Sequence, residues 1–272
     1  MIIVGELINS SRKVVASAIE AEDAGFVRKL ARDQAEAKAH YIDVNAGTFK
    51  DVEADYVKWL VQNVQAVVDL PCCIDSADPR VIEAALSIHH GTPMINSISL
   101  EKKRCSNLLP ILAGTDFKIV ALCMSDSGMP RTADDRIRIA RDLIDLLLKH
   151  KVKIENIYVD PLVQPIATDQ SFGREFLAAV ERIMALFPGV HTICGLSNVS
   201  FGLPLRKFLN RTFVGMAIAK GLDTVILNPL DKRMMANIVA ADALAGNDRF
   251  CMEFIRAYRE GKLEPGDQNQ AA

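Results

Sequence analysis

Short apolar runs alternate with longer amphipathic segments along the whole chain. Between the runs, segments such as 23–39 and 131–151 repeat apolar residues at intervals of three and four, as helices with one buried face do. This alternation predicts parallel strands separated by helices. We expect strands at residues 2–7, 41–47, 72–78, 93–99, 118–126, 157–162, 191–198 and 223–230.

Eight strand–helix units in a chain of 272 residues match a single closed (β/α)8 barrel, the TIM barrel, which we expect over residues 1–260. An open doubly wound sheet is the alternative. Such sheets often carry a glycine-rich turn after the first strand, and neither GxGxxG nor GxxxxGK[ST] occurs here. No linker rich in proline, glycine or serine divides the chain, and we expect residues 261–272 to form a polar tail.

The composition is that of a soluble globular protein, with 50% apolar and 24% charged residues. A net charge of -2 gives no electrostatic reason to expect a nucleic-acid partner, and the basic residues at 101–104 are interpreted as a solvated helix face. The chain shows neither a signal peptide nor a membrane-spanning run, which favours the cytoplasm. The six cysteines lack CxxC spacing and are interpreted as reduced core thiols.

The predicted strands end in carboxylates, amides or small polar residues. In a barrel, the carboxyl ends of the strands meet on the face that carries the active site. Any one such residue also fits a turn or a helix cap, and Asp78 before Pro79 is best interpreted as a cap. The polar strand-end residues are Glu6, Asn9, Asp43, Asn45, Asp75, Asn96, Ser125, Asp126, Asp160, Asn198 and Asn228.

These strand ends supply Asp and Asn side chains, and no histidine pair has metal-ligand spacing. A ring of carboxylates suits a hard cation such as Mg²⁺, which stays an alternative. A flat heterocycle with several N–H donors is the better match, because Asp accepts hydrogen bonds and Asn both accepts and donates. We therefore expect a heterocycle site without a bound metal.

Several of these strand ends together resemble a known family. The chain resembles the methyltetrahydrofolate:corrinoid protein methyltransferases, which are pterin-binding barrels related to the folate domain of cobalamin-dependent methionine synthase and to dihydropteroate synthase. The resemblance spans essentially the whole chain. It is carried by GELIN (5–9), DVNAG (43–47), IDS (74–76), MINS (94–97), YVDPL (158–162), GLSNVS (195–200) and LNRTF (209–213).

The resemblance implies roles for four residues that carry the chemistry. Asp75, Asn96 and Asp160 would hold the pyrimidine side of the pterin by hydrogen bonds. Asn198 would lie near N5 of tetrahydrofolate, the nitrogen that carries the methyl group, as the catalytic residue. An amide there can stabilise the charge that develops on N5 without ionising itself. When N5 donates its methyl group, N5 needs a proton or a strong hydrogen bond, and water coupled to the carboxylates would supply the proton.

Five further residues are placed at the site by the same resemblance. Gly195 and Ser197 would shape the floor beneath the pterin ring, and Arg206 matches a basic position close to it. Asp43 and Asn45 match the second strand end of pterin barrels, where the resemblance says less about their roles.

The resemblance implies methyl transfer between the cobalt of a corrinoid and N5 of tetrahydrofolate. None of the five histidines lies in the DxHxxG loop of corrinoid-carrying domains, so the corrinoid is expected on a separate protein. The segment 5–15 favours enzymes of quaternary-amine pathways such as glycine betaine demethylation, with methylcorrinoid as donor. The family also suggests a homodimer.

Three alternatives to this function stay open. The first is the reverse reaction, from 5-methyltetrahydrofolate to a corrinoid iron–sulfur protein. The second is a dihydropteroate synthase-like enzyme, although that family carries basic residues after the serine of the seventh strand, where this chain has Asn198 and Val199. The third is a pterin-binding barrel that has lost catalysis.

Overall fold

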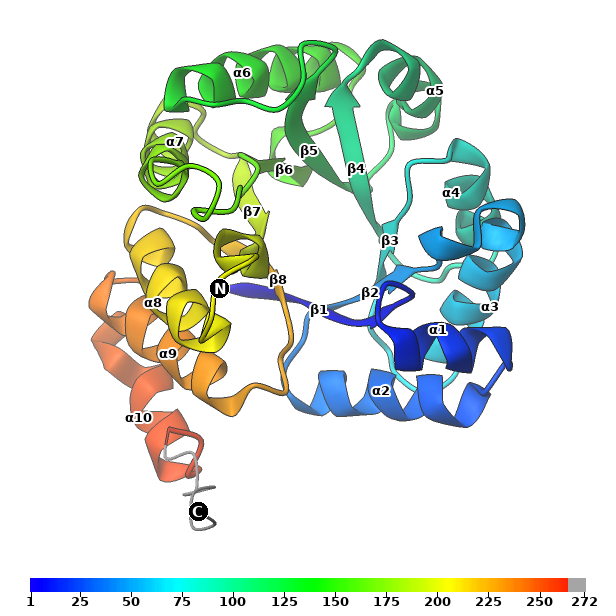
Figure 1. Ribbon diagram of the computed structural model, residues 1–272, viewed down its shortest axis with the longest axis horizontal. Helices are drawn as coiled ribbons and strands as arrows, with labels where there is room; N and C mark the ends of the chain where they lie inside the picture. The colour runs from blue at the N-terminus through cyan, green and yellow to red at the C-terminus, as the bar shows by residue number, and fades with distance from the viewer. Residues whose placement is uncertain (264–272) are drawn as a thin grey trace.

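The computed structural model describes residues 1–263 as a closed barrel of eight parallel strands (Figure 1). The strands follow one another around the barrel in sequence order, and β1 pairs with both β2 and β8 to close it. The predicted TIM barrel is therefore confirmed. The strands are β1 (Ile2–Asn9), β2 (Tyr41–Asn45), β3 (Cys72–Asp75), β4 (Met94–Leu100), β5 (Lys118–Ser125), β6 (Ile157–Asp160), β7 (His191–Gly195) and β8 (Thr224–Leu227).

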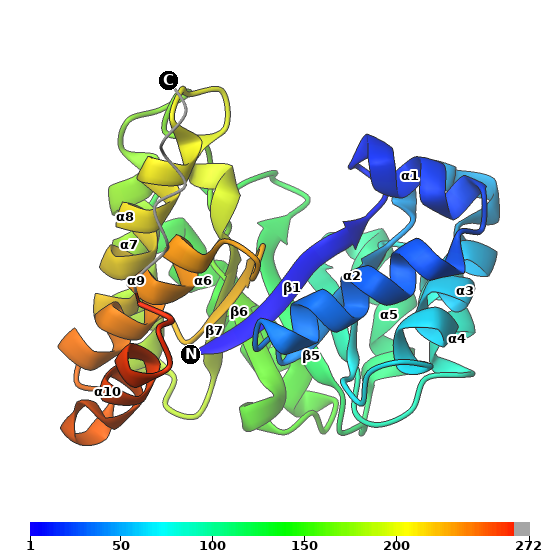
Figure 2. The ribbon, with the colours of Figure 1, turned by 90° about the horizontal axis from the view of Figure 1, so that it is seen from below.

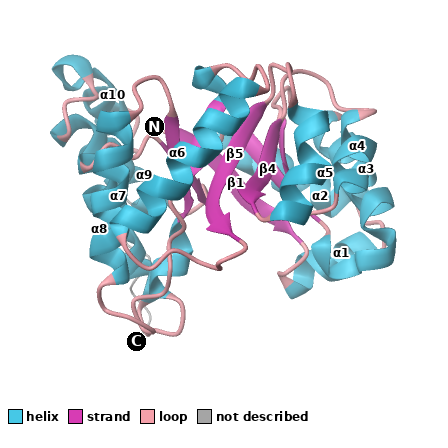
Figure 3. Ribbon diagram, turned by 90° about the horizontal axis from the view of Figure 1, so that it is seen from above, coloured by secondary structure: helices cyan, strands magenta, loops and turns pink. Residues whose placement is uncertain are grey.

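Helices surround the strands on the outside of the barrel (Figure 3). The α-helices are α1 (Lys13–Glu20), α2 (Ala24–Glu36), α3 (Glu53–Gln65), α4 (Pro79–Leu86), α5 (Lys102–Leu112), α6 (Ala133–Lys149), α7 (Phe172–Leu186), α8 (Arg206–Ala219), α9 (Lys232–Leu244) and α10 (Met252–Arg259). Short 3₁₀ helices are η1 (Gly47–Val52), η2 (Ile154–Asn156), η3 (Leu196–Ser200) and η4 (Arg249–Cys251).

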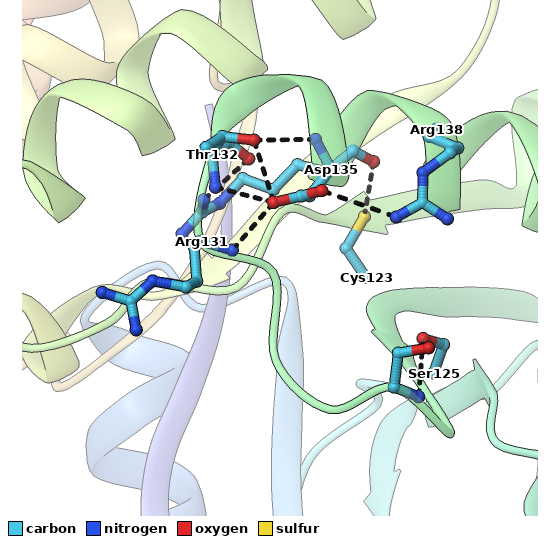
Figure 4. A network of polar contacts seen from close by, with 8 residues as sticks. Cys123, Ser125, Arg131, Thr132, Asp135 and Arg138 are labelled. Carbon is cyan, nitrogen blue, oxygen red and sulfur yellow. Dashed lines mark hydrogen bonds and ion pairs between the residues drawn. The ribbon is translucent and has the colours of Figure 1, made fainter.

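Polar side chains fix where several of these helices begin. Thr132 and Asp135 form a reciprocal capping box at α6, in which each side chain accepts a hydrogen bond from the backbone N–H of the other (Figure 4). Asp78 accepts a hydrogen bond from the backbone N–H of Arg80, so the predicted cap ahead of Pro79 is confirmed. Each such cap stabilises its helix by about 1 kcal/mol.

Side chains that alternate along the strands fill the barrel interior with an apolar layer. One hydrophobic cluster draws on every strand, which is the expected packing of a closed barrel of this size. The intervening residues point outward and pack under the helices. The interior layer consists of Val4, Cys73, Met94, Val120, Tyr158 and Ile193, with Ile2, Tyr41 and Ile226 packed against them.

Strand β1 contains an irregularity just before its carboxyl end. Its register against β2 shifts between Gly5 and Ile8. At this point the side-chain oxygen of Gln34, on α2, accepts a hydrogen bond from the backbone N–H of Leu7 at 3.0 Å. A Cβ on Gly5 would lie 2.4 Å from that same oxygen, so the contact requires glycine.

The cysteines follow the expected pattern with one exception. Cys72, Cys73, Cys123 and Cys194 are buried on strands as free thiols, and Cys105 is partly exposed. Cys251 is exposed on η4, so its interpretation as a core thiol is wrong.

The polar tail expected from residue 261 lies mostly outside the described residues, and its boundary stays a prediction. None of the helices within residues 1–263 is long and apolar enough to cross a membrane.

Candidate active site at the carboxyl ends of the strands

Polar residues form the next interior layer, on the carboxyl side of the apolar one. Because interior positions recur every second residue, Glu6 follows Val4 and Asp160 follows Tyr158 on the same inner face. Asp75 and Asn96 are direct neighbours in the register of β3 and β4. Closure of the barrel therefore brings predicted residues from distant parts of the chain to one mouth. This layer comprises Glu6, Asp43, Asp75, Asn96, Asp160, Gly195 and Asn228.

Asn45 is fixed against Asp75. Its amide nitrogen donates to the Asp75 carboxylate at 3.0 Å and to the Asp75 carbonyl oxygen at 3.2 Å. Its amide oxygen accepts from Ser10 Oγ and from the backbone N–H of Gly47, both at 3.1 Å. With both ends of its amide engaged, Asn45 orients Asp75.

Asp43 is the most enclosed carboxyl of the site, at 2% exposure. Its Oδ1 atom is buried and has no hydrogen-bond partner among the described residues. Burial raises the pKa of this carboxyl well above its ordinary value, and the nearby charges of Asp75 and Glu6 raise it further. Asp43 is therefore a carboxyl that holds a proton readily beside other acids.

Arg104 contacts the site from α5, where the sequence predicted a solvated helix face. Its Nε donates to the Ser97 carbonyl oxygen at 2.9 Å, and a second nitrogen donates to Ser97 Oγ at 3.2 Å. Burial raises the pKa of Asp75, while the bond from Asn45 and the charge of Arg104 lower it. The prediction for residues 101–104 is thus wrong for Arg104 and correct for the exposed Lys102 and Lys103.

Asp160 and Asn96 present hydrogen-bonding groups to the mouth. Asp160 Oδ1 accepts from the backbone N–H of Leu162 at 2.8 Å. Burial raises the pKa of Asp160 to about 7, against the opposing effects of that bond and of Arg136. No described residue hydrogen-bonds with the side-chain amide of Asn96, so its oxygen and nitrogen can face a ligand.

Asn198 lies on η3 with its side chain exposed at the mouth. A Cβ on Gly195 would lie 3.3 Å from Asn198 Nδ2, so the bare glycine backbone lies directly beside the amide. Arg206 holds η3 in place, donating to the Ser197 carbonyl oxygen at 2.7 Å and to Ser200 Oγ at 3.1 Å. Ser197 and Arg206 thus support the segment that carries Asn198.

Glu6 joins the site from β1. Burial raises the pKa of Glu6, and the charges of Arg12 and Arg206 oppose that rise. The sequence placed Glu6 at a strand end without giving it a role. The sequence did contain a pattern that predicts its position. Glu6 is two residues after Val4 and four after Ile2, so all three side chains point into the barrel.

Other polar strand-end residues serve the backbone. The side chains of Asn9 and Asn228 accept hydrogen bonds from backbone N–H groups two residues further on, as turn residues do. Ser125 forms a backbone turn with Gly128, and Asp126 accepts from the first backbone N–H of α5 at 3.2 Å. Within residues 1–263, no group of three or more His, Cys, Asp or Glu side chains is arranged to hold a metal ion.

The site combines carboxylate acceptors, a free amide and an exposed asparagine beside a bare glycine, all at the mouth of a closed barrel. This set suits a flat ring with N–H donors along one edge, and together with the fold it defines a pterin-binding (β/α)8 barrel. Residues 5–228 match the family described as pterin binding enzyme. The chain belongs to this family.

Two similar proteins show which branch of the pterin-binding family this chain resembles. The chain is 38% identical over 267 residues to the methylcorrinoid:tetrahydrofolate methyltransferase of Eubacterium limosum, covering 97% of this chain and 98% of that one. It is 31% identical over 242 residues to the methionine synthase of Mycobacterium tuberculosis, covering 84% of this chain and 20% of that one. The resemblance to corrinoid-linked methyltransferases is therefore confirmed.

Solved structures share the fold at lower identity. A dihydropteroate synthase of Coxiella burnetii in complex with pteroic acid superposes with a TM-score of 0.69 at 15% identity, covering 91% of this chain and 94% of that one. A dihydropteroate synthase of Xanthomonas albilineans with 4-aminobenzoic acid gives 0.66 at 17% identity, covering 91% and 92%. These similarities show a common barrel architecture.

Proposed function

We propose that this enzyme transfers a methyl group from methylcorrinoid, carried on a separate corrinoid protein, to N5 of tetrahydrofolate, giving 5-methyltetrahydrofolate. The similarity to the Eubacterium limosum enzyme over nearly the whole of both chains supports the reaction. The observation that carries the proposal is the exposed amide of Asn198 beside Gly195, facing a mouth rich in hydrogen-bond acceptors.

Asp75, Asn96 and Asp160 hold the pyrimidine side of the pterin. The two carboxylates accept hydrogen bonds from ring N–H and amino groups, and the free amide of Asn96 donates and accepts. Gly195 and Ser197 form the floor beneath the ring, because any side chain on Gly195 would crowd Asn198. Asn45 and Arg206 act indirectly by fixing Asp75 and η3.

In the transfer, the lone pair of N5 forms the new bond to the methyl carbon. The cobalt–carbon bond breaks and its electron pair stays on cobalt. N5 then carries positive charge and releases its proton through water towards the buried carboxyls. Asp43 in its ionised form suits this role, because its raised pKa makes the carboxylate a stronger proton acceptor and its Oδ1 has no hydrogen-bond partner among the described residues. Asn198 stabilises the charge on N5 through its hydrogen bond.

The direction and the partner are finer parts of the proposal. The similarity of segment 5–15 to enzymes of quaternary-amine pathways favours methylcorrinoid as donor, in a pathway such as glycine betaine demethylation. The reverse transfer, to a corrinoid iron–sulfur protein, would use the same residues, so running the assay from both sides measures the preferred direction. The lack of a DxHxxG loop supports a corrinoid supplied by another protein. We propose the cytoplasm as the compartment of the reaction.

We also propose that the enzyme is a homodimer. Helix α10 buries Ala257 and leaves Tyr258 at 62% and Met252 at 56% exposure. Phe250 on η4, at 77%, and Leu244 at the end of α9, at 90%, extend this surface. Exposed apolar side chains gathered on these successive elements favour a protein contact.

Asn198→Ala tests the function directly. We expect turnover to fall by ~10²-fold or less, because the amide acts mainly in the transition state and water partly replaces it. Asn198→Asp should not restore turnover, because a carboxylate favours protonated N5, a poor nucleophile. The measurement is single-turnover transfer from methylcob(III)alamin to tetrahydrofolate, with tetrahydrofolate affinity measured in parallel.

The control is Asn107→Ala, which removes an exposed amide from the outer helix α5 and should leave transfer unchanged. Transfer by Asn198→Ala at the wild-type rate would exclude the proposed role. Loss of tetrahydrofolate binding in Asn198→Ala would instead make Asn198 a ligand-holding residue.

A further inference from the structure

Arg136, in the first turn of α6, is an arginine with 0% exposure. It lies on the face of α6 that also buries Ala133, Ile137, Ala140 and Leu143. Charged side chains are almost never fully buried unless they are paired. No described carboxylate forms an ion pair with Arg136, so its burial requires another explanation.

The guanidinium group of Arg136 donates to three backbone carbonyl oxygens. Nε donates to Pro161 at 2.8 Å, one terminal nitrogen to Leu162 at 3.3 Å, and the other to Thr132 at 3.0 Å. Thr132 is the fixed start of α6, and Pro161 and Leu162 directly follow Asp160. Arg136 therefore ties the turn after β6 to the beginning of α6.

The Pro161–Leu162 segment also fixes the Asp160 side chain. Leu162 has a left-handed backbone, with φ of 64°, and its N–H donates to Asp160 Oδ1 at 2.8 Å. A leucine does not hold this conformation without support from its surroundings. The bond to the Leu162 carbonyl supplies such support from the protein interior, and the second Asp160 oxygen is left for a ligand.

Three charged or titratable side chains among the described residues face Asp160. These are Arg136 from α6, Cys123 from β5 and Cys194 from β7, and both thiols are fully buried. Arg136 itself is faced by Cys123, Asp135 and Asp160, and by Glu175 from α7. The Cys123 thiol also contacts the Arg136 carbonyl oxygen at 3.5 Å beside the capping box (Figure 4). Arg136 is thus the positive charge that faces Asp160.

We propose that Arg136 is a positioning residue of the pterin site, which acts through Asp160 by holding its carboxyl in the barrel mouth and by favouring its ionised form. This inference rests on the proposed function for the identity of the ligand. The geometric link from Arg136 through the Pro161–Leu162 turn to Asp160 is independent of that ligand.

The first experiment needs no ligand. The Asp160 carboxyl is titrated by NMR in protein labelled with ¹³C at aspartate carboxyls, and its signal is assigned by its loss in Asp160→Asn. In Arg136→Gln, which removes the charge, we expect the pKa of Asp160 to rise by roughly one unit. Arg138→Gln is the matched control, because Arg138 is exposed on the same helix and bonds to Asp135. An unchanged pKa in folded Arg136→Gln would overturn the inference.

The second experiment measures tetrahydrofolate affinity against pH by calorimetry. A rise of one unit in the pKa of Asp160 lowers its ionised fraction at pH 7 by about fivefold, and we expect affinity to fall equally in Arg136→Gln and to recover at higher pH. Arg136→Lys keeps the charge but cannot reach three carbonyls, so we expect a loss of about fivefold that persists at high pH.

The two experiments separate the inference from the proposed function. If Arg136→Gln does not fold, Arg136→Lys decides, and wild-type affinity of Arg136→Lys at high pH overturns the positioning role. If the pKa of Asp160 rises as expected while Asp160→Asn binds tetrahydrofolate like wild type, Arg136 positions Asp160 and the proposed pterin contact is wrong.

Discussion

At the scale of single residues, four asparagines at strand ends have four different surroundings. Asn45 has both ends of its amide bonded to neighbouring groups, and Asn228 accepts from a backbone N–H in a turn. Asn96 has no described partner for its amide, and Asn198 is exposed beside Gly195. The residue type sets what each can do, and the neighbours decide whether it supports the site or faces the ligand.

Asp160→Asn gives a prediction for stability against pH. The native carboxyl keeps its proton up to about pH 7, whereas the unfolded chain releases it near 3.8. The raised pKa means that this group favours folding below about pH 4, and that this contribution is lost as pH rises towards 7. Compared with wild type, Asp160→Asn should therefore gain roughly 1 to 3 kcal/mol in unfolding free energy between pH 4 and pH 8.

Urea unfolding at a series of pH values measures this difference. Asp169→Asn is the control, because hydrogen bonds from Ser171 lower the pKa of the partly exposed Asp169 carboxyl, so that its effect on stability has the opposite dependence on pH. A difference between Asp160→Asn and wild type that does not vary with pH would contradict the prediction.

At the scale of elements, the carboxyl end of β1 depends on its contact with α2. The buried Gln34 side chain occupies the space that a side chain on Gly5 would need, and it satisfies the N–H of Leu7 where the register of β1 shifts. That contact fixes the strand segment between Gly5 and Ile8, which carries Glu6 into the mouth. The Gln34 side chain of α2 thus fixes the part of β1 that carries Glu6.

Gly5→Ala should destabilise the protein by about 1 to 3 kcal/mol. The new methyl group displaces Gln34 Oε1 and leaves the buried N–H of Leu7 without its partner. Thermal unfolding followed by circular dichroism measures the loss. Gly215→Ala in α8 is the control, because its Cβ meets Ala241 at an ordinary 3.9 Å and alanine favours the helix. Equal stability of Gly5→Ala and wild type would contradict this prediction, because it would mean that the Gln34 side chain can move away without loss of unfolding free energy.

At the scale of the whole molecule, the two ends of the barrel have different surfaces. The strands end towards α1, while the N-terminus and α10 lie towards the opposite end (Figure 2). Met1 is ion-paired there with Asp242 at 3.2 Å, beside a cavity of about 690 Å³ lined by residues of α9, η4 and α10. A dimer contact through α10 would therefore leave the mouth open to the corrinoid protein.

Sedimentation equilibrium tests the proposed dimer. Phe254 and Ile255 also lie on α10, at 37% and 38% exposure. We expect wild type to sediment as a dimer and Phe254→Glu/Ile255→Glu to sediment as a monomer, because two carboxylates in an apolar contact are desolvated without partners. Val14→Glu is the control, because Val14 is exposed at 67% on α1, away from α10. A monomeric wild type would contradict the homodimer, and a dimeric double variant would place the contact elsewhere.

The sequence by itself determined the barrel and the polar residues at the ends of its strands. Strand and helix periods are local properties, so the alternation of apolar runs located every strand to within one residue of its start. The polar residues at the ends of those runs, among them Asp75, Asn96 and Asp160, follow from the same local pattern. The types of polar side chain at the barrel mouth could therefore be predicted before any contact was known.

Tertiary structure alone decided which side chains support that chemistry. Arg136 bonds to the Pro161 carbonyl oxygen 25 residues further along the chain, which only the closed barrel brings within reach. Arg104 bonds locally to Ser97, seven residues earlier, but its charge acts on Asp75 of the neighbouring strand β3, which the sheet brings beside it. The sequence does show one sign of the role of Arg136, because this charged residue lies among the apolar positions on the buried face of its helix. The raised pKa values of Asp43 and Asp160 were likewise beyond the sequence, because burial of a carboxyl and the charges around it arise only when distant segments pack together.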